Sequence, residues 1–161
     1  MDEAGETQHA LGLLEEIERD PDTTQATLAT RLGVAVGTVN WHLKRLIAKG
    51  YVKVKRAERR KLRYILTPEG LALRARLTVA YVERSMALYR QAREEARRAL
   101  ALAREKGYRS VSVDGDGDIA DVARLTCLEQ GMPIEADGRD PRRAVLEVRG
   151  QKIVLREPGA E

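Results

Sequence analysis

Several features that many proteins have are missing from this chain of 161 residues. It has a single cysteine, Cys127, no phenylalanine and only 4% aromatic residues. One cysteine excludes an intramolecular disulfide and is typical of a reducing compartment. No apolar stretch approaches the roughly 20 residues of a membrane-spanning helix, and residues 1–7 lack the basic and apolar parts of a signal peptide. We therefore expect a cytoplasmic protein without a membrane partner, with a core of Leu, Val, Ile and Ala.

Residue patterns for catalysis are missing as well. The chain has two histidines, His9 and His42, and no Ser-His-Asp set, metal-ligand cluster or Walker loop is visible. The hydrophobic content of 43% excludes global disorder. We therefore expect a folded protein that is not an enzyme and requires no metal or cofactor. Cys127 falls on the inward face of a predicted helix, which favours a buried thiol over a redox sensor.

Charge is distributed unevenly along the chain. Residues 24–67 carry eleven basic side chains and one acidic side chain, whereas residues 1–23 carry one basic and eight acidic. The formal net charge of the whole chain is +4. A basic block that coincides with a structural motif is typical of a nucleic-acid-binding module. A solvated surface without a nucleic-acid partner is the alternative.

The first half of the chain predicts three short helices. Residues 9–19 have helical apolar spacing, and Pro21 ends that helix. Thr24 is a suitable N-cap for a second helix over 25–31, and Gly33 supplies the turn that follows. A third helix is expected from about 36 to 49. The apolar face of this third helix consists of Val39, Leu43, Leu46 and Ile47. That face should pack on Leu13, Ile17, Leu28 and Leu32.

A basic hairpin is predicted after the third helix. Residues 51–55 and 62–66 alternate as strands do, and residues 56–61 form the loop between them. Thr67 is the predicted N-cap of the next helix, with Pro68 in its first turn. Two helices joined by a tight turn and followed by a cationic hairpin suit a reader of duplex DNA.

Candidate DNA contacts follow from this arrangement. Asn40 can bridge adenine, Lys44 and Arg45 favour guanine or phosphate, and Trp41 and Val36 could meet a thymine methyl. Gly37 allows close approach of the backbone, Thr38 suits a phosphate, and His42 is expected at the flank. For Trp41, packing in the core is the alternative. On the hairpin, the basic residues should hold phosphates or enter the minor groove; they are Lys53, Lys55, Arg56, Arg59, Arg60, Lys61 and Arg63.

One long helix, or two with a break, is expected over residues 69–106, ended by Gly107. A 3-4 apolar spacing runs along it through Val79, Val82, Met86, Tyr89, Ala96, Leu100 and Ala103, with Arg93 at the remaining position. Such a repeat favours a coiled coil. We therefore expect homodimerisation through residues 71–107, and intramolecular packing of this helix is the alternative.

A small α/β unit is predicted over residues 108–157. Strands are expected at 109–113, 133–137, 144–148 and 152–155, with a helix over 119–130. The turn between the first strand and the helix has the spacing of a G-x-G-x-x-A dinucleotide fingerprint at Gly115 and Gly117, and Asp137 lies where an acid would bind a ribose hydroxyl. Asp118 would also serve as a plain N-cap. Two interpretations stay open: a site for a nucleotide-like effector, or a structural unit without a ligand.

The motifs carry a resemblance to a known family. Residues 24–90 resemble the MarR-type winged-helix regulators associated with bacterial exopolysaccharide gene clusters. The matching segments are 32–34, 37–40, 43–54 and 64–70. It implies a winged helix-turn-helix, a long helix after the wing, and binding of double-stranded DNA. Some related regulators add a small Rossmann-like piece, to which residues 115–123 are similar.

Together these observations predict an α+β protein in three parts. Residues 8–70 form the DNA-binding domain, residues 71–107 the dimerising helix, and residues 108–157 a small sensor-like unit. The expected function is sequence-specific transcriptional regulation by a homodimer. Two other classes compete with it: a winged-helix adaptor for protein contacts, and an enzyme that uses a nucleotide near Gly115.

Overall fold

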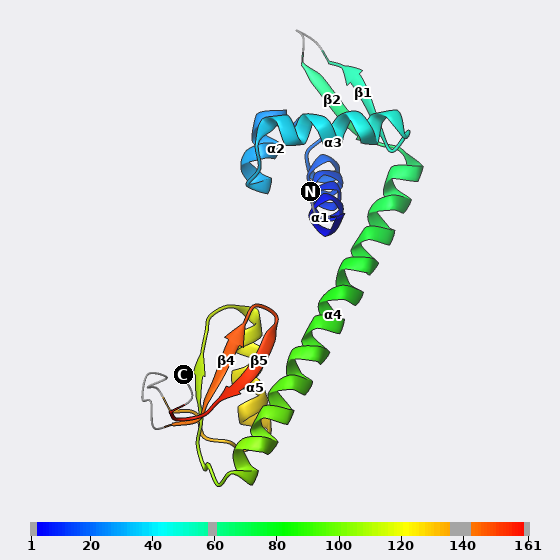
Figure 1. The fold of residues 1–161 in the computed structure, drawn as a ribbon. Coiled ribbons are helices and arrows are strands. Elements are labelled where there is room, and N and C mark those ends of the chain that lie inside the picture. The colour runs from blue at the N-terminus through cyan, green and yellow to red at the C-terminus, as the bar shows by residue number, and fades with distance from the viewer. Residues whose placement is uncertain (1–2, 58–60, 136–142, 160–161) are drawn as a thin grey trace. The chain divides into compact units, whose positions relative to one another are not determined.

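The computed structural model describes residues 3–57, 61–135 and 143–159 and confirms the α+β class. The chain forms two compact units, Met1–Glu83 and Arg84–Glu161, and one long helix belongs to both (Figure 1). Within the described ranges, no helix is both long enough and apolar enough to cross a membrane.

Three helices build the first unit: α1 (Glu3–Arg19), α2 (Gln25–Leu32) and α3 (Val36–Ala48). The hydroxyl of Thr24 accepts a hydrogen bond from the Thr27 amide, so the predicted cap of α2 is confirmed. Gly33 ends α2 with φ of 65°, a conformation that favours glycine. Helix α1 begins six residues before the predicted start at residue 9, and acidic Glu3 and Glu6 in its first turn suit a helix N-terminus.

The core of this unit lies between the three helices and the hairpin. Val39, Leu43 and Leu46 of α3 are buried against Leu13, Leu14, Ile17 and Leu28, as predicted. Ile47 is 36% exposed, so its predicted place in the core is wrong. It lies about 80° from Val39 around the helix. His42 lies about 60° from Val39 in the other direction, and it is buried instead.

The wing is an antiparallel hairpin of β1 (Val52–Arg56) and β2 (Leu62–Leu66). Val52 and Tyr64 lie on its inner face and are buried in the core of the first unit. The Tyr64 amide donates to the carbonyl of Pro21, which ties the wing to the segment after α1. The register places Lys55 opposite Arg63, and the predicted loop residues 58–60 lie outside the described residues.

Helix α4 (Pro68–Glu105) begins as predicted, because the Thr67 hydroxyl accepts from the Gly70 amide at 3.0 Å. The same hydroxyl donates to the carbonyl of Gly50 at 2.6 Å, which joins the helix start to the end of α3. A side chain at position 70 would collide with the carbonyl of Tyr51 and with Leu66. Glycine is therefore required where α4 passes the wing.

The apolar repeat along α4 is divided between two environments. Val79, Val82, Met86 and Tyr89 are exposed, whereas Ala96, Leu100 and Ala103 are buried in the core of the second unit. A coiled coil that uses the whole repeat is therefore wrong, and the packing of residues 92–103 is intramolecular. Their small side chains suit close approach of the sheet and of the last helix.

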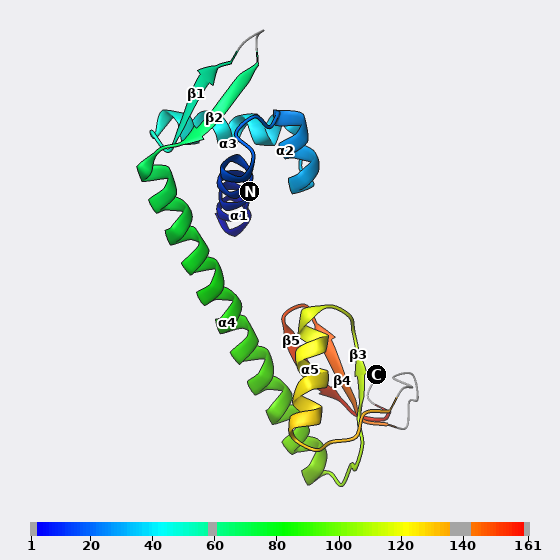
Figure 2. The same cartoon turned by 180° about the vertical axis from the view of Figure 1, so that it is seen from behind.

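The second unit places α5 (Asp118–Glu129) against a three-stranded sheet (Figure 2). The strand order is β3 (Ser112–Asp114), β4 (Val145–Arg149), β5 (Lys152–Arg156), with β3 and β4 parallel and β4 and β5 antiparallel. Val111 forms a parallel bridge with Ile134, and this bridge is what the structure describes of the strand predicted at 133–137. Val148 and Ile153 share the face on which the helices pack.

Polar contacts fasten the C-terminal half of α4 to the rest of the second unit. Arg93 pairs with Glu129 at 2.9 Å, and Lys106 pairs with Glu157. The Glu95 carboxylate accepts a hydrogen bond from the Ile153 amide at 2.8 Å. This bond satisfies a backbone N–H on the unpaired side of the edge strand β5. The helix is thus an integral part of this unit from residue 92 onward.

Candidate nucleic-acid interface

The outward face of α3 presents the side chains that the sequence singles out. Gly37, Trp41 and Lys44 follow one another at helical spacing and are exposed. Val36 and Arg45 are also exposed, whereas Thr38 and Asn40 are half-buried at the two margins of this face. Each α3 residue predicted to contact DNA therefore keeps at least part of its surface open to solvent.

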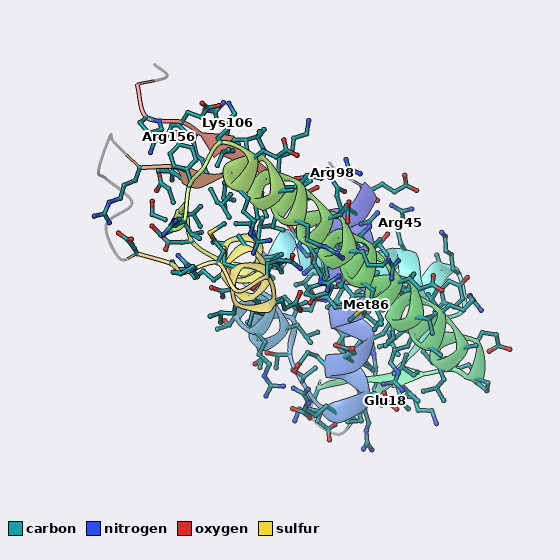
Figure 3. All side chains as sticks on the ribbon, turned by 90° about the horizontal axis from the view of Figure 1, so that it is seen from below. Glu18, Arg45, Met86, Arg98, Lys106 and Arg156 are labelled. Atoms are coloured by element: carbon teal, nitrogen blue, oxygen red, sulfur yellow. The ribbon has the colours of Figure 1, made fainter. Side chains whose placement is uncertain are left out.

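Trp41 is 38% exposed, so it is not a core residue. The guanidinium of Arg45 lies over its ring, 4.5 Å from the ring centroid. The His42 ring meets the indole edge-on, with 4.7 Å between ring centroids. Arg45, labelled in Figure 3, also pairs with Glu6 of α1 at 3.6 Å. The indole therefore contacts two protein side chains, while part of it is open to solvent.

His42 is buried beneath Trp41, which the sequence analysis missed. It is 5% exposed, and its Nε2 atom has no hydrogen-bond partner in the described structure. Its ring also contacts that of His9, at 5.6 Å between centroids. Burial, and then the neighbouring His9 and Arg45, lower the pKa of His42, against the opposite effect of Glu6. The signal in the sequence was its spacing, three residues after buried Val39 and four before buried Leu46.

Four of the basic residues described in the wing share one face. Residues that pair across an antiparallel hairpin point to the same side, so Lys53 and Lys55 share a side with Arg63. Lys61 lies on that side too, because its carbonyl accepts from the Ala57 amide in the next pair of the ladder. Arg56 falls on the opposite side, and Arg63 pairs with Asp22 at 3.6 Å. Arg59 and Arg60 lie outside the described residues.

A cavity of about 220 Å³ lies beside α3. Its walls come from α1, α3 and the start of α4, and they include Glu6, His42, Arg45, Lys49, Leu73 and Leu77. The cavity thus has both polar and apolar walls, and Arg45 belongs both to it and to the exposed face of α3.

The glycine turn of the second unit is largely occupied by the protein's own groups. Gly115 has φ of 135° and packs against Val148, and its carbonyl accepts from Arg124 at 2.9 Å. Gly117 is the N-cap of α5 and caps it without a side chain, so the predicted capping by Asp118 is wrong. Asp137 lies outside the described residues. The described residues hold no cluster of metal-binding side chains.

Cys127 is buried on the inner face of α5, as predicted. Burial raises the pKa of its thiol to about 11. Because the thiolate is the reactive form, this position suits packing and is unsuited to redox chemistry.

Comparisons with known proteins place residues 7–53 among winged helix-turn-helix modules. A family model described as winged helix-turn-helix DNA-binding matches residues 7–53. Among solved structures, the chain is similar to MepR, a transcription regulator of the Staphylococcus aureus multidrug efflux pump MepA, at 28% identity and a TM-score of 0.45. The similarity covers 53% of this chain and 63% of that one, less than two thirds of its length. No curated protein matches the chain by sequence. Over residues 7–53 the chain is therefore similar to winged helix-turn-helix DNA-binding modules.

Proposed function

We propose that this chain is a sequence-specific regulator of transcription that binds double-stranded DNA as a homodimer. The observation that carries the proposal is the exposure of groove-reading and basic residues on two successive elements of one module. Trp41 and Lys44 lie on the exposed face of α3, and Lys53 and Lys55 lie on one face of the wing that follows it. In this arrangement α3 enters the major groove, and the wing lies on the backbone or in the minor groove.

The two elements divide the work of recognition. On α3, Asn40, Trp41 and Lys44 read base edges, while Thr38 binds phosphate and Gly37 permits close approach. On the wing, the lysines and arginines hold phosphates and supply affinity that is independent of sequence. The support for this division is exposure and residue chemistry. Lys53, Lys55 and Lys61 are exposed, and within the described residues none of them is held in an ion pair.

In this proposal the homodimer interface uses only part of residues 71–107. The apolar stripe of Val79, Val82, Met86 and Tyr89 is exposed on α4 and keeps the 3-4 spacing of a helix–helix seam. Met86 is labelled in Figure 3. A second copy of the chain offers a matching stripe, and a two-fold dimer suits two half-sites on DNA.

Substitution of Met86 tests the dimer directly. A Met86→Glu variant should be monomeric in sedimentation velocity at concentrations where the wild type is dimeric, because it places two carboxylates in an apolar seam. Tyr81→Glu is the matched control, since Tyr81 is 53% exposed and lies outside the 3-4 spacing. If both variants sediment as the wild type does, the stripe is not the interface.

Residues 108–157 are proposed as a regulatory unit for a nucleotide-like effector. The support is the turn itself: two glycines with positive φ, at the end of β3 and the start of α5, in a unit with parallel strands. Binding there would alter DNA affinity through α4, which belongs to both units. Hydrogen exchange of the wing and α4 with and without saturating NAD checks this coupling. Unchanged exchange would count against a dinucleotide effector.

Selection of bound sequences from a random duplex library at about 150 mM salt tests the main proposal. Enrichment of an inverted repeat with half-sites one helical turn apart is the expected result. Genomic matches to it would name the operons, and exopolysaccharide gene clusters are the first candidates from the family resemblance. Binding without any enrichment would reject a sequence-specific site, and salt-independent capture of a protein partner would favour the adaptor function.

Two variants separate base reading from phosphate binding on the selected duplex. Asn40→Ala should relax the preference at one position of each half-site, at a cost of about 1–3 kcal/mol. Lys55→Ala should instead weaken binding to all sequences alike. Equal behaviour of the two variants would contradict the assigned roles.

A further inference from the structure

We propose that Glu6 and Arg45 are positioning residues that fix the indole of Trp41 as a reader of thymine methyl groups. The inference rests on the proposed function and goes further, because it names the base feature that is read. It also removes Arg45 from the direct contacts to DNA. Sequence preference would then depend on α1, which itself does not enter the groove.

The guanidinium of Arg45 already makes two contacts within the protein. Its guanidinium stacks over the Trp41 ring at 4.5 Å and pairs with the Glu6 carboxylate at 3.6 Å. Stacking over an indole face is a favourable place for a guanidinium, and the carboxylate beside it holds it there. The neighbouring Lys44 is exposed, and within the described residues it has no ion pair. On this turn of α3, Lys44 is therefore free to contact a phosphate, whereas Arg45 is already held by Trp41 and Glu6.

Trp41 is held by two side chains. Arg45 lies over its ring, and His42 packs against it at 4.7 Å between centroids with the ring planes 82° apart. His42 cannot easily move, because it is 5% exposed and packs in turn on His9. An exposed aromatic side chain usually loses rotamer freedom on binding. In this protein, contacts with Arg45 and His42 already restrict the rotamers of Trp41 before DNA binds. The exposed surface of the indole is therefore pre-organised.

A fixed apolar surface in the major groove points to thymine. The C5-methyl of thymine is the apolar feature that the major-groove edge of a base pair offers. An indole presents carbon atoms and one N–H donor, so contact with a methyl uses its most abundant surface. The expected target is thus a half-site with thymine at the step facing Trp41.

Replacement of thymine by deoxyuridine in the selected duplex removes only that methyl group. For the wild-type protein, we expect one such replacement per half-site to weaken binding about four-fold, as for the burial of one methyl-sized group. Trp41→Ala should bind both duplexes equally. Arg45→Lys keeps the charge but loses the flat stacking partner, so it should bind the uracil duplex as the wild type does and lose most of the four-fold preference for thymine.

Lys44→Ala is the matched control. It removes one positive charge from the same helical turn without touching Trp41, so it should weaken binding to both duplexes and preserve their ratio. Glu6→Gln should reduce the ratio in the same direction as Arg45→Lys. If Arg45→Lys keeps the full difference between thymine and uracil, or if Arg45→Ala behaves as Lys44→Ala does, Arg45 is a phosphate contact and the inference is wrong.

The free protein provides a readout that does not depend on DNA. Trp41 is the sole tryptophan of the chain, so intrinsic fluorescence reports on this ring alone. Acrylamide quenching should rise in Arg45→Ala and Glu6→Gln and stay at the wild-type value in Lys44→Ala. Equal quenching in all four proteins would overturn the positioning role.

The two proposals fail in distinguishable ways. A protein that selects no duplex overturns the proposed function and this inference with it. A protein that selects a duplex in which uracil has no effect at any position overturns this inference alone.

Discussion

At the scale of single residues, adjacent positions on α3 have opposite environments. Trp41 faces solvent, whereas His42 is buried with an unpartnered ring nitrogen. The cost of desolvating a charged imidazole keeps His42 neutral over a wider pH range than a free histidine. Protonation of this side chain is therefore linked to the packing of α3 on α1.

The free energy of unfolding should fall on acidification because of His42. Its pKa in the folded protein lies below the ordinary value of 6.5. Between that folded pKa and 6.5 the unfolded chain binds more protons, so stability is lost as the pH decreases through this window. Above 6.5 both states are neutral at this site and its contribution is constant. Urea titrations across this range measure the slope, and His42→Asn should show a shallower one. An unchanged slope would mean that other groups cause it.

Cys127 should react slowly with thiol reagents in the folded protein. With a pKa of about 11, against an ordinary value of 9.0, its thiolate fraction near neutral pH is smaller by about a hundred-fold. Burial reduces access to it further. The rate of reaction with a disulfide reagent such as DTNB at pH 8 measures this, and unfolding in urea should restore the rate of an ordinary cysteine. Fast labelling of the native protein would show that α5 opens readily.

At the scale of elements, α4 shows how far the sequence could predict the fold. Its start at Thr67 and Pro68 and its end before Gly107 follow from local capping chemistry, and both are confirmed. The use of its apolar repeat was not predictable in the same way. Whether Leu100 meets a second chain or a strand of its own chain depends on where residues 144–156 return, and no local pattern determines that. The burial of His42 was missed for a similar reason, since a polar residue at the margin of an apolar face goes where tertiary packing leaves space.

The two halves of α4 should respond differently to truncation of large side chains. Leu100→Ala removes a fully buried side chain from the second core. We expect it to lower the free energy of unfolding by about 2–5 kcal/mol. Leu102→Ala is a control on the same turn, because Leu102 is 41% exposed. Its effect should stay within about 0.5 kcal/mol. Denaturant unfolding followed by circular dichroism measures both, and similar losses would mean that the core around Leu100 is wrongly described.

At the scale of the whole molecule, the acidic and basic segments partly neutralise each other. Residues 1–23 provide carboxylates to basic residues elsewhere: Glu16 to Arg31, Asp22 to Arg63 and Glu18 to Arg74. The basic block over residues 24–67 was evident in the sequence, whereas the identity of its paired members was not, because pairing depends on which helix faces it. The lysines of the wing are exposed and have no such pair within the described residues. They should therefore dominate the interaction with phosphates.

The salt dependence of DNA binding should distinguish these two groups of cations. A lysine that contacts a phosphate displaces counterions, so each such contact contributes about 0.9 to the slope of log K against log salt. The double variant Lys53→Ala, Lys55→Ala should thus make this negative slope shallower by about 1.8 per subunit. Arg31→Ala serves as the control, because Arg31 pairs with Glu16 at 2.7 Å and its charge is neutralised within the protein. Fluorescence anisotropy with a labelled duplex at several salt concentrations gives the slopes. A slope that falls as much for Arg31→Ala as for one wing lysine would show that net charge, and not the wing surface, determines affinity.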